Sequence, residues 1–576
     1  MSAPARPPAL AGECMVATSQ PTATAAGLRM LRDGGNAADA ALAAAAVLCV
    51  TEPMSTGPGG DLFALVWRDG RPEGLDAAGP APRGAPRGAA PDELGPRSVN
   101  VPGAVAGWAA LAERHGRLGL DACLQDAIGL ARDGFVVAAR CAAQWAASTV
   151  VPDTFAPVPA TGARVSLPEL SATLSSIARD GPPAFYAGPV AEAICEATWL
   201  EAEDLAAMRA RWVEPLRAGY LGHEIIEMPP PTQGVAALEA LALLERTGGT
   251  LADRVTCCRL ALEDALREVR DDADVAHLLA PAAIERRLGD AVATPAEPGG
   301  GTVYLCAVDG DGMAVSLVQS LFYGFGSGVV APGTGVALHN RAACFAVAGA
   351  VEPGRRPYHT IIPGLIARDG ADVSHLLADE HIRARWAGIP GPVAEPAGGT
   401  VCVCVVDQDG MAVSLLQSLY ESFGSGVVAG ETGIVLHNRA AGFAVQGEVI
   451  GGVRPYHTLI PGMLTRDGEL VGPFGLMGGF IQAQSHTQFL CELMRGRDGP
   501  GDPQAALDQG RFRIDGRTLS LEPPLWDRAG ELADLGFDIH RAVERAPFGG
   551  GQAIIVRDGT LFGGSDARKD GCALGF

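Results

Sequence analysis

The chain carries one stretch of sequence twice in succession, and this repeat limits the folds open to it. The first copy reads TVYLCAVDGDGMAVSLVQSL from Thr302, and the second reads TVCVCVVDQDGMAVSLLQSL from Thr400. The same offset of 98 positions links Thr360 to Thr458, so copy one spans 273–370 and copy two 371–468. A solenoid needs at least three stacked repeats. We therefore expect one core with a tandem copy inserted, of which only one copy need be active.

The regions that flank the repeat differ in pattern. Residues 1–272 are mostly helical, with helices expected over 103–115, 121–133, 202–211 and 235–246, and with Asn36 placed to cap an alanine-rich helix. In copy two, HTLIPGMLTRDG runs directly into ELVGPFGLMGG, which predicts an unbroken hairpin leading into the C-terminal region, 469–576. Strands with flanking helices indicate an α+β layered fold.

Composition excludes several classes of protein. The net charge of −22 argues against nucleic-acid binding, which depends on clustered Lys and Arg. The long apolar run Ala37–Val50 contains Asp39 and is shorter than the roughly 20 residues that a bilayer span requires, so we expect a buried helix and no membrane partner. The 13 cysteines show no CxxC pairs or metal-ligand spacing. Reduced thiols and the absence of a secretion signal favour a cytoplasmic location.

Several long segments, in order along nearly the whole chain, resemble the γ-glutamyltransferase family of N-terminal-nucleophile hydrolases. They are GGNAADAALAAAAVLCVTEPMSTGPGGDLFALVW, VPGAVAGWAALAERHG, MPPPTQGVAALEALALLE and GGSDARKDGCALGF. The resemblance implies a four-layer αββα sandwich. It also implies an inactive single chain that cuts itself before a threonine, giving two fragments that stay associated. No metal or organic cofactor is expected.

The resemblance places the nucleophile at Thr400 or Thr302, each of which follows a glycine and opens a β-rich run. A hydroxyl needs a base to become a good nucleophile. Cleavage before the threonine frees an α-amine, with an ordinary pKa of about 7.7–8.0, that can serve as this base. Ser418 matches a position whose hydroxyl supports the nucleophile. Gly478 and Gly479 match the oxyanion hole, where backbone N–H groups stabilise the tetrahedral intermediate.

The two copies are not equivalent in their connections. The chain has a single GLMGG segment, and copy two leads into it without interruption, which favours Thr400. Copy one directly follows the family-like helices and keeps the tyrosine of TVYLC, which favours Thr302.

The positions that would grip an amino-acid head group have all changed. The family's residues there correspond to Arg439, Tyr420, His457 and Thr458 in copy two, and Arg341 is the copy-one equivalent of Arg439. Arginine suits a substrate carboxylate by bidentate pairing. The pattern is similar to a branch that includes an oxamate amidohydrolase, so we expect an amidase or acyltransferase acting on γ-glutamyl or similar small carboxylated amides.

Each of these residues could instead have a purely structural role. A threonine that opens a strand is commonly only a good β former. His457 could be a hydrogen-bonded structural histidine, and Arg439 could anchor a loop through backbone carbonyls. The alternative function is a non-cleaving pseudoenzyme or binding protein left by the duplication.

Overall fold

A computed structural model describes most of the chain. The described residues are 7–68, 70–86, 92–289, 301–310, 314–324, 332–333, 335–338, 364–367, 401–445, 448–495, 500–543 and 546–576. Thr400 and Arg341 lie outside these ranges, and Thr302 lies in a strand of which only the backbone is described.

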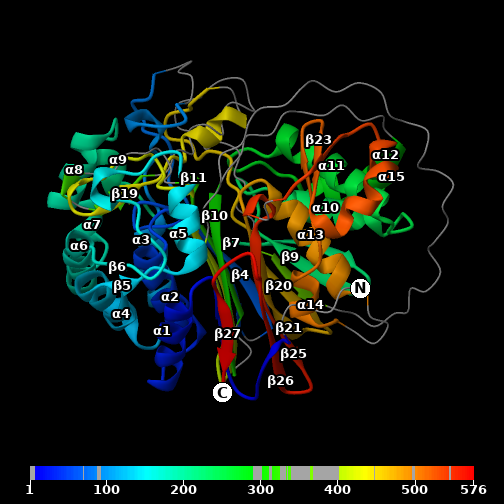
Figure 1. The fold of residues 1–576 in the computed structure, drawn as a ribbon, viewed down its shortest axis with the longest axis horizontal. Coiled ribbons are helices and arrows are strands. Elements are labelled where there is room, and N and C mark those ends of the chain that lie inside the picture. Colours follow the sequence, from blue (N-terminus) through cyan, green and yellow to red (C-terminus); the bar gives the residue numbers. More distant parts are fainter. Residues whose placement is uncertain are drawn as a thin grey trace.

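Two large sheets form the centre of the molecule (Figure 1). One has nine strands in the order β11-β17-β10-β2-β15-β16-β3-β4-β7, and the other has eight in the order β1-β26-β25-β21-β20-β14-β9-β8. The first sheet is built from β11 (Ala314–Gly324), β17 (Tyr420–Glu421), β10 (Gly301–Gly310), β2 (Met15–Thr18), β15 (Val401–Val406), β16 (Gly410–Ser418), β3 (Asp61–Arg68), β4 (Arg71–Ala77) and β7 (Arg211–Val213). The second is built from β1 (Ala9–Ala11), β26 (Thr560–Ser565), β25 (Gly550–Arg557), β21 (Glu469–Met477), β20 (Pro461–Arg466), β14 (Gly364–Ala367), β9 (His223–Glu227) and β8 (Leu216–Tyr220).

Helices cover the outer face of each sheet (Figure 1). On the side of the nine-stranded sheet they are α1 (Pro21–Arg32), α2 (Ala37–Thr51), α3 (Ala104–His115), α4 (Gly119–Asp133), α5 (Ala139–Ala146), α6 (Pro168–Asp180), α7 (Pro183–Tyr186), α8 (Pro189–Ala197) and α9 (Ala202–Ala206). On the other side they are α10 (Gly234–Leu244), α11 (Leu251–Glu268), α12 (Pro281–Gly289), α13 (Ile481–Leu493), α14 (Pro503–Leu507) and α15 (Ala529–Ala533). The mixed helix and sheet class predicted from the sequence is confirmed.

Smaller elements complete the described structure. A three-stranded sheet contains β22 (Phe512–Asp515), β23 (Thr518–Leu521) and β24 (Asp538–Arg541), while β27 (Cys572–Gly575) ends the chain. Two-stranded pairs are formed by β5 (Phe135–Val136) with β6 (Arg164–Val165), β12 (Pro332–Gly333) with β18 (Gly430–Glu431), and β13 (Gly335–Ala337) with β19 (Ile434–Leu436).

The alanine-rich helix α2 begins and packs as its sequence predicts. The Asn36 side chain accepts the N–H groups of Ala38 and Asp39, and the Asp39 side chain accepts the N–H of Asn36, which completes a capping box. All residues of α2 are buried, since the small side chains allow neighbours to approach on every side. None of the described helices is both long and apolar enough to cross a bilayer.

One expected helix is shorter than its pattern indicated. We expected a helix over 202–211, but α9 ends at Ala206, and Arg211 already belongs to β7. Trp212 and Val213 pair with Leu75 and Gly74 of β4, so sheet pairing outweighs the helical pattern at this end.

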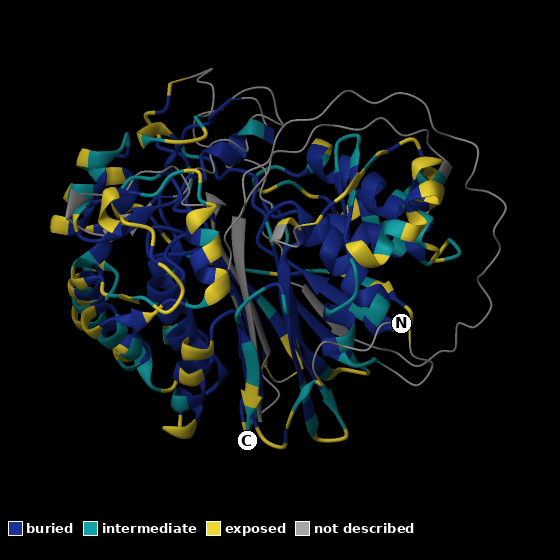
Figure 2. Ribbon diagram, viewed as in Figure 1, coloured by how far each residue is buried: buried dark blue, intermediate teal, exposed yellow. Residues whose placement is uncertain are grey.

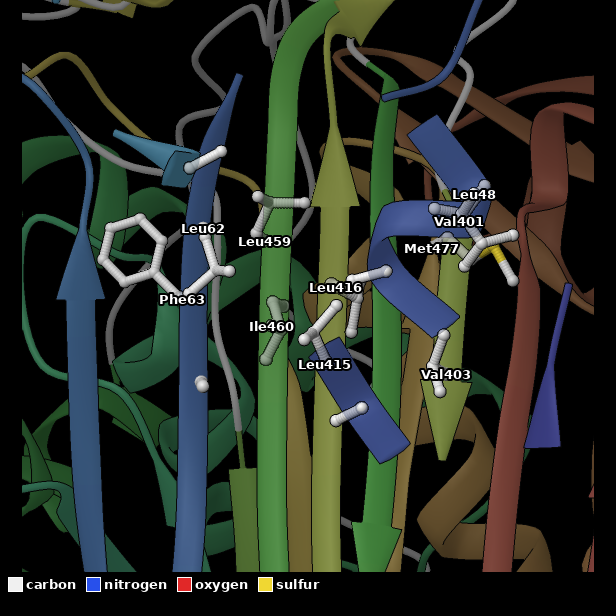
Figure 3. Packing of buried hydrophobic residues seen from close by; sticks show 14 of the residues in the cluster. Leu48, Leu62, Phe63, Val401, Val403, Leu415, Leu416, Leu459, Ile460 and Met477 are labelled. Carbon is white, nitrogen blue, oxygen red and sulfur yellow. The ribbon is translucent and has the colours of Figure 1, made fainter. Parts of the chain in front are cut away.

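The core extends between the two sheets and under the helices that cover them. Figure 3 shows Leu62 and Phe63 of β3 and Val401 and Val403 of β15 packed with Leu415, Leu416, Leu459, Ile460 and Met477. The side chains of β15 and β16 whose burial is described are buried on both faces, apart from the half-buried Gly410, because helices cover the face that does not meet the other sheet. Figure 2 shows a buried centre with exposed residues on the outer helices. Strands covered on both faces are apolar along their whole length, as in VCVCVV.

The hairpin predicted between the end of copy two and the C-terminal region is present. Strands β20 and β21 pair in antiparallel register from Pro461↔Gly475 to Arg466↔Glu469. Asp467 and Gly468 form the two-residue turn, and both have positive φ, +55° and +80°, as a type I′ turn requires.

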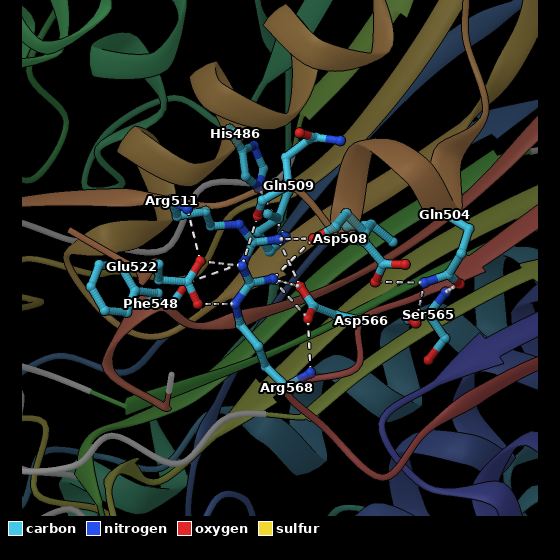
Figure 4. A network of polar contacts seen from close by, with 12 residues as sticks. His486, Gln504, Asp508, Gln509, Arg511, Glu522, Phe548, Ser565, Asp566 and Arg568 are labelled. Carbon is cyan, nitrogen blue, oxygen red and sulfur yellow. Dashed lines mark hydrogen bonds and ion pairs between the residues drawn. The ribbon is translucent and has the colours of Figure 1, made fainter. Parts of the chain in front are cut away.

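A buried ionic network holds the C-terminal segment against the small three-stranded sheet (Figure 4). Arg568 pairs with Glu522 and Asp566, and Arg511 pairs with Asp566 at 2.7 Å. Burial raises the pKa of Asp566, but the charges of Arg568 and Arg511 outweigh this, and the net effect is a lowered pKa. Two arginines therefore balance two carboxylates inside the protein.

The two copies of the repeat pair with the same strands. Val66 of β3 pairs with Val315 of β11 and with Val413 of β16. Ile226 of β9 pairs likewise with Leu365 of β14 and with Met463 of β20. In both cases the two partners are separated by the 98-residue repeat offset.

Candidate active site

The ends of three strands meet where β15 begins. Val401, the first residue of β15, pairs with Gln417 of β16. The next residue of β16, Ser418, pairs with Asp61, which opens β3. Thr400, the candidate nucleophile, directly precedes Val401 in the sequence and lies outside the described residues.

Ser418 is buried and has a defined role in the backbone around it. Its Oγ accepts the N–H of Tyr420 at 2.8 Å. Tyr420 has a φ of +83°, an unusual conformation for a residue with a side chain, and the Ser418 hydrogen bond stabilises it. Ser418, which the family resemblance predicts to support the nucleophile, therefore stabilises the turn at Tyr420.

The glycine pair follows the end of β21. Gly478 and Gly479 have φ values of +130° and +76°. A Cβ on Gly478 would lie 2.9 Å from the Cα of Gly549, so a larger residue does not fit without a shift of the backbone. The adjacent Phe480 stacks on Tyr456 at a centroid distance of 5.1 Å. This stack places the glycine pair beside the segment that carries His457 and Thr458.

A buried polar cluster surrounds Asp61, a residue that our sequence interpretation did not single out. One carboxylate oxygen lies 2.7 Å from Nε2 of His457 and 3.6 Å from Nε of Arg439. The other lies 3.9 Å from Nε2 of His437 and accepts the N–H groups of Gly79 and Gly103 at 3.3 Å. All four side chains in the cluster are fully buried.

Two side chains of this cluster carry opposite charges. Burial lowers the pKa of His437 well below its usual value, so this imidazole is neutral at physiological pH. Arg439 and Asp61 then supply one charge of each sign. The only sequence signals for this arrangement were the acidic end of STGPGGD before a strand and the histidine in HNR, and neither identifies a partner.

Arg439 is held on three sides. Its guanidinium lies 4.8 Å from the ring centroid of Tyr420 and faces Asp61, and Nη1 donates to Oγ1 of Thr458 at 3.4 Å. Four residues selected from the sequence thus lie together: Arg439, Tyr420, His457 and Thr458. A guanidinium fixed by a ring, a carboxylate and a hydroxyl is pre-organised for planar recognition.

A cavity of about 370 Å³ lies beside this cluster. Ala78 and Pro80 line it on either side of Gly79, whose N–H donates to Asp61. Its wall also contains Arg454, which pairs with the buried Asp76, and Arg211, which pairs with the same carboxylate at 3.1 Å. Larger cavities of about 860 and 640 Å³ are lined by other residues, around α6 and between α11 and α13. Among the residues described, no group of three or more side chains is arranged to hold a metal ion.

Comparisons with known proteins identify the family of the chain. The γ-glutamyltranspeptidase family model matches residues 23–377 and 372–576, and the two matches overlap close to the start of copy two. The glutathione hydrolase-like YwrD proenzyme of Bacillus subtilis is 33% identical, over 98% of this chain and 98% of its own length. The oxamate amidohydrolase proenzyme of Klebsiella pneumoniae is 35% identical, over 59% of this chain and 74% of its own length.

A solved structure agrees as well. The crystal structure of a cephalosporin acylase from Bacillus halodurans matches with a TM-score of 0.75 and 31% identity, covering 100% of this chain and 98% of the acylase. Family, sequence and structure comparisons together show that this chain belongs to the γ-glutamyltranspeptidase family and is an enzyme of its hydrolase and transferase type.

Proposed function

We propose that the chain is a self-processing amidase or acyltransferase with Thr400 as its nucleophile, acting on small carboxylated amides. The observation that carries this proposal is the meeting of four features at one point between the sheets. They are the start of β15, Ser418, the glycine pair and the buried Asp61 cluster with Arg439. We infer that the layered arrangement is the αββα sandwich of N-terminal-nucleophile hydrolases.

The first reaction is cleavage of the chain. The hydroxyl of Thr400 attacks the carbonyl carbon of Gly399, the peptide C–N bond breaks, and the acyl group moves to the threonine oxygen. Water then hydrolyses this ester, which leaves a carboxylate on Gly399 and a free α-amine on Thr400. The glycine before the threonine tolerates the backbone conformations that this shift requires.

The second reaction uses the same hydroxyl on the substrate. The α-amine of Thr400 takes the hydroxyl proton, and the oxygen attacks the amide carbonyl. Backbone N–H groups of Gly478 and Gly479 stabilise the oxyanion, and such a donor is worth about 3–4 kcal/mol. The amine leaves with a proton, and water or an amino acceptor releases the acyl group.

The two fragments would remain together after cleavage because their strands alternate in one sheet. In the nine-stranded sheet β15 pairs with β2, and β16 pairs with β3. Strands β2 and β3 belong to the large fragment, 1–399, whereas β15 and β16 belong to the small fragment, 400–576. We also propose the division of the chain into a helical region 1–272, the two copies 273–370 and 371–468, and the C-terminal region 469–576.

The substrate class follows from the polar cluster. Arg439, Tyr420 and Thr458 contact one another in a buried cluster, and a guanidinium recognises a carboxylate better than an ammonium does because it can pair with both oxygens. The relative named oxamate amidohydrolase supports a small anionic amide. Localisation in the cytoplasm remains our prediction.

A denaturing gel with N-terminal sequencing tests self-cleavage. Scaling the mass of 59.1 kDa by length, a cut before Thr400 gives fragments of roughly 41 and 18 kDa, and a cut before Thr302 gives roughly 31 and 28 kDa. A single band after long incubation of pure protein would support the pseudoenzyme instead.

Substrate recognition is tested by Arg439→Lys on the processed enzyme. We expect KM for oxamate or a γ-glutamyl anilide to rise about tenfold or more, because the bidentate contact is lost. Turnover of an uncharged amide of similar size should change little. Equal losses on the charged and uncharged substrates would contradict a role in carboxylate binding.

A further inference from the structure

Both copies of the repeat pair with the same residues of β3 and of β9, and one molecule cannot form both sets of pairs at once. A strand has two edges for hydrogen bonding. Along β3, Val66 pairs with Glu73 of β4 on one edge, so Val315 and Val413 compete for the other. On β9, Ile226 pairs with Arg217 of β8, which leaves one edge for Leu365 and Met463. Both sheets therefore have one position for which two segments compete.

The segment 449–453 of copy two packs against residues 81–85, and its contacts define what either copy needs in order to occupy this position. Ile450 and Val453 are buried in a small apolar cluster with Ala81, Ala85 and Phe443. Gly452 donates its N–H to the carbonyl of Ala81, and the N–H of Ala81 donates to the carbonyl of Val453. At Gly451 an added Cβ would lie 2.5 Å from the carbonyl oxygen of Pro82, closer than real Cβ contacts allow.

Copy one carries residues that do not fit this docking site at the positions equivalent to Ile450, Gly451 and Val453. The repeat offset aligns Ile450, Gly451 and Val453 with Glu352, Pro353 and Arg355. In this position Glu352 and Arg355 would bury charge in an apolar cluster, which is costly. Pro353 would bring ring atoms against the backbone of Pro82. The sequence of copy one is therefore incompatible with this docking site.

A second site of exclusion lies at the turn near β18. Gly430 has a φ of +51°. The copy-one equivalent is Pro332, whose ring fixes φ near −65° and cannot adopt this conformation. Copy two also leads into β21 through the tight turn at Asp467 and Gly468, a connection that copy one lacks.

We infer that copy two alone occupies the nucleophile position in the sheets, and that Pro332, Glu352, Pro353 and Arg355 keep copy one out of it. This inference rests on the proposed function for its catalytic meaning, because occupancy selects Thr400 over Thr302. Occupancy itself can be measured without any cleavage or turnover.

Hydrogen exchange with mass spectrometry measures occupancy directly. Peptides from 314–324 and 410–418 differ in sequence and can be followed separately. We expect slow exchange in 410–418 and fast exchange in 314–324, since only the resident strand pairs with β3. Equal protection, or protection of 314–324 alone, would overturn the inference. Protection of 410–418 in a chain that never cleaves would uphold it while rejecting the proposed self-cleavage.

A gain-of-function variant tests the four exclusion residues. In Pro332→Gly/Glu352→Ile/Pro353→Gly/Arg355→Val, copy one carries the copy-two residue at every point of exclusion. Both copies then fit, and equal free energies would give about half of the molecules each arrangement. We expect protection of 314–324 to rise and, if self-cleavage occurs, a new N-terminus reading TVYLC.

The matched control differs from this variant by one Cβ atom, at position 353. It is the same variant with Pro353→Ala in place of Pro353→Gly, and the alanine Cβ still meets the carbonyl of Pro82. We expect this control to retain the wild-type protection pattern and to yield only TVCVC. If the glycine variant also retains the wild-type pattern, these residues do not select the copy.

Discussion

Replacement of Asp61 by asparagine should destabilise the protein strongly, because it removes the one negative charge facing Arg439 in the described cluster. Arg439, His457 and Asp61 are all fully buried, and the carboxylate lies 2.7 Å from His457 and 3.6 Å from Arg439. Asparagine has nearly the same shape. If its amide oxygen accepts from Gly79 and Gly103, as Asp61 does, its NH₂ group must face the guanidinium.

The magnitude follows from the burial of the pair. Breaking a fully buried ion pair by removing one partner costs about 3–5 kcal/mol, because the remaining charge stays in a medium of low polarity. Removing an exposed partner costs far less, and Asp33→Asn breaks such a pair with Arg29, whose side chains are 52% and 41% exposed. We expect about 0.5 kcal/mol or less for this control.

Urea unfolding monitored by circular dichroism and tryptophan fluorescence provides the measurement, on full-length chains with matching processing. The two signals should change together for the free energies to be comparable. A loss below about 1 kcal/mol for Asp61→Asn would refute the argument that this carboxylate balances Arg439 in a buried site.

Three further predictions concern other parts of the structure. Burial lowers the pKa of His437, so below about pH 6.5 the unfolded chain binds one more proton than the folded chain. The free energy of unfolding should therefore fall as the pH drops, by up to about 1.4 kcal/mol per pH unit. In His437→Gln this part of the pH dependence should vanish from urea midpoints measured between pH 7 and 5. Gly478→Ala should lower kcat by about 10²–10³-fold through displacement of an oxyanion donor, whereas Gly559→Ala, at a turn with φ of +76° and open space for a Cβ, should leave kcat unchanged. Arg568→Met should cost about 3–5 kcal/mol because Glu522 and Asp566 lose a shared partner; an unchanged urea midpoint would contradict this.

Local features of the fold could be predicted from the sequence because their causes are local. The cap at Asn36, the burial of α2 and the Asp467-Gly468 hairpin each depend on residues within a few positions of one another. The length of α9 could not, since pairing of β7 with β4, more than 100 positions earlier in the chain, determines where that helix ends.

The candidate site divides in the same way. Ser418, Gly478, Arg439 and His457 were selected through a resemblance that covers long segments. Ser418 pairs with Asp61, which Arg439 and His457 face, and Gly478 precedes the stack of Phe480 on Tyr456. Asp61 and His437 gave no comparable signal, because a single acidic residue or histidine does not reveal its partner across hundreds of positions.

The sequence by itself determined that this chain repeats a segment and that each copy carries a threonine where the family resemblance implies a nucleophile. The two copies read almost alike, and the direct connection of copy two to the single GLMGG segment favoured Thr400 without excluding Thr302. Our inferred choice between them rests on the tertiary structure: β11 and β16 pair with the same edge of β3, and a Cβ at Gly451, where copy one has Pro353, would meet the carbonyl of Pro82. Steric exclusion and burial act between residues distant in sequence, so this choice becomes visible only when the sheets are assembled.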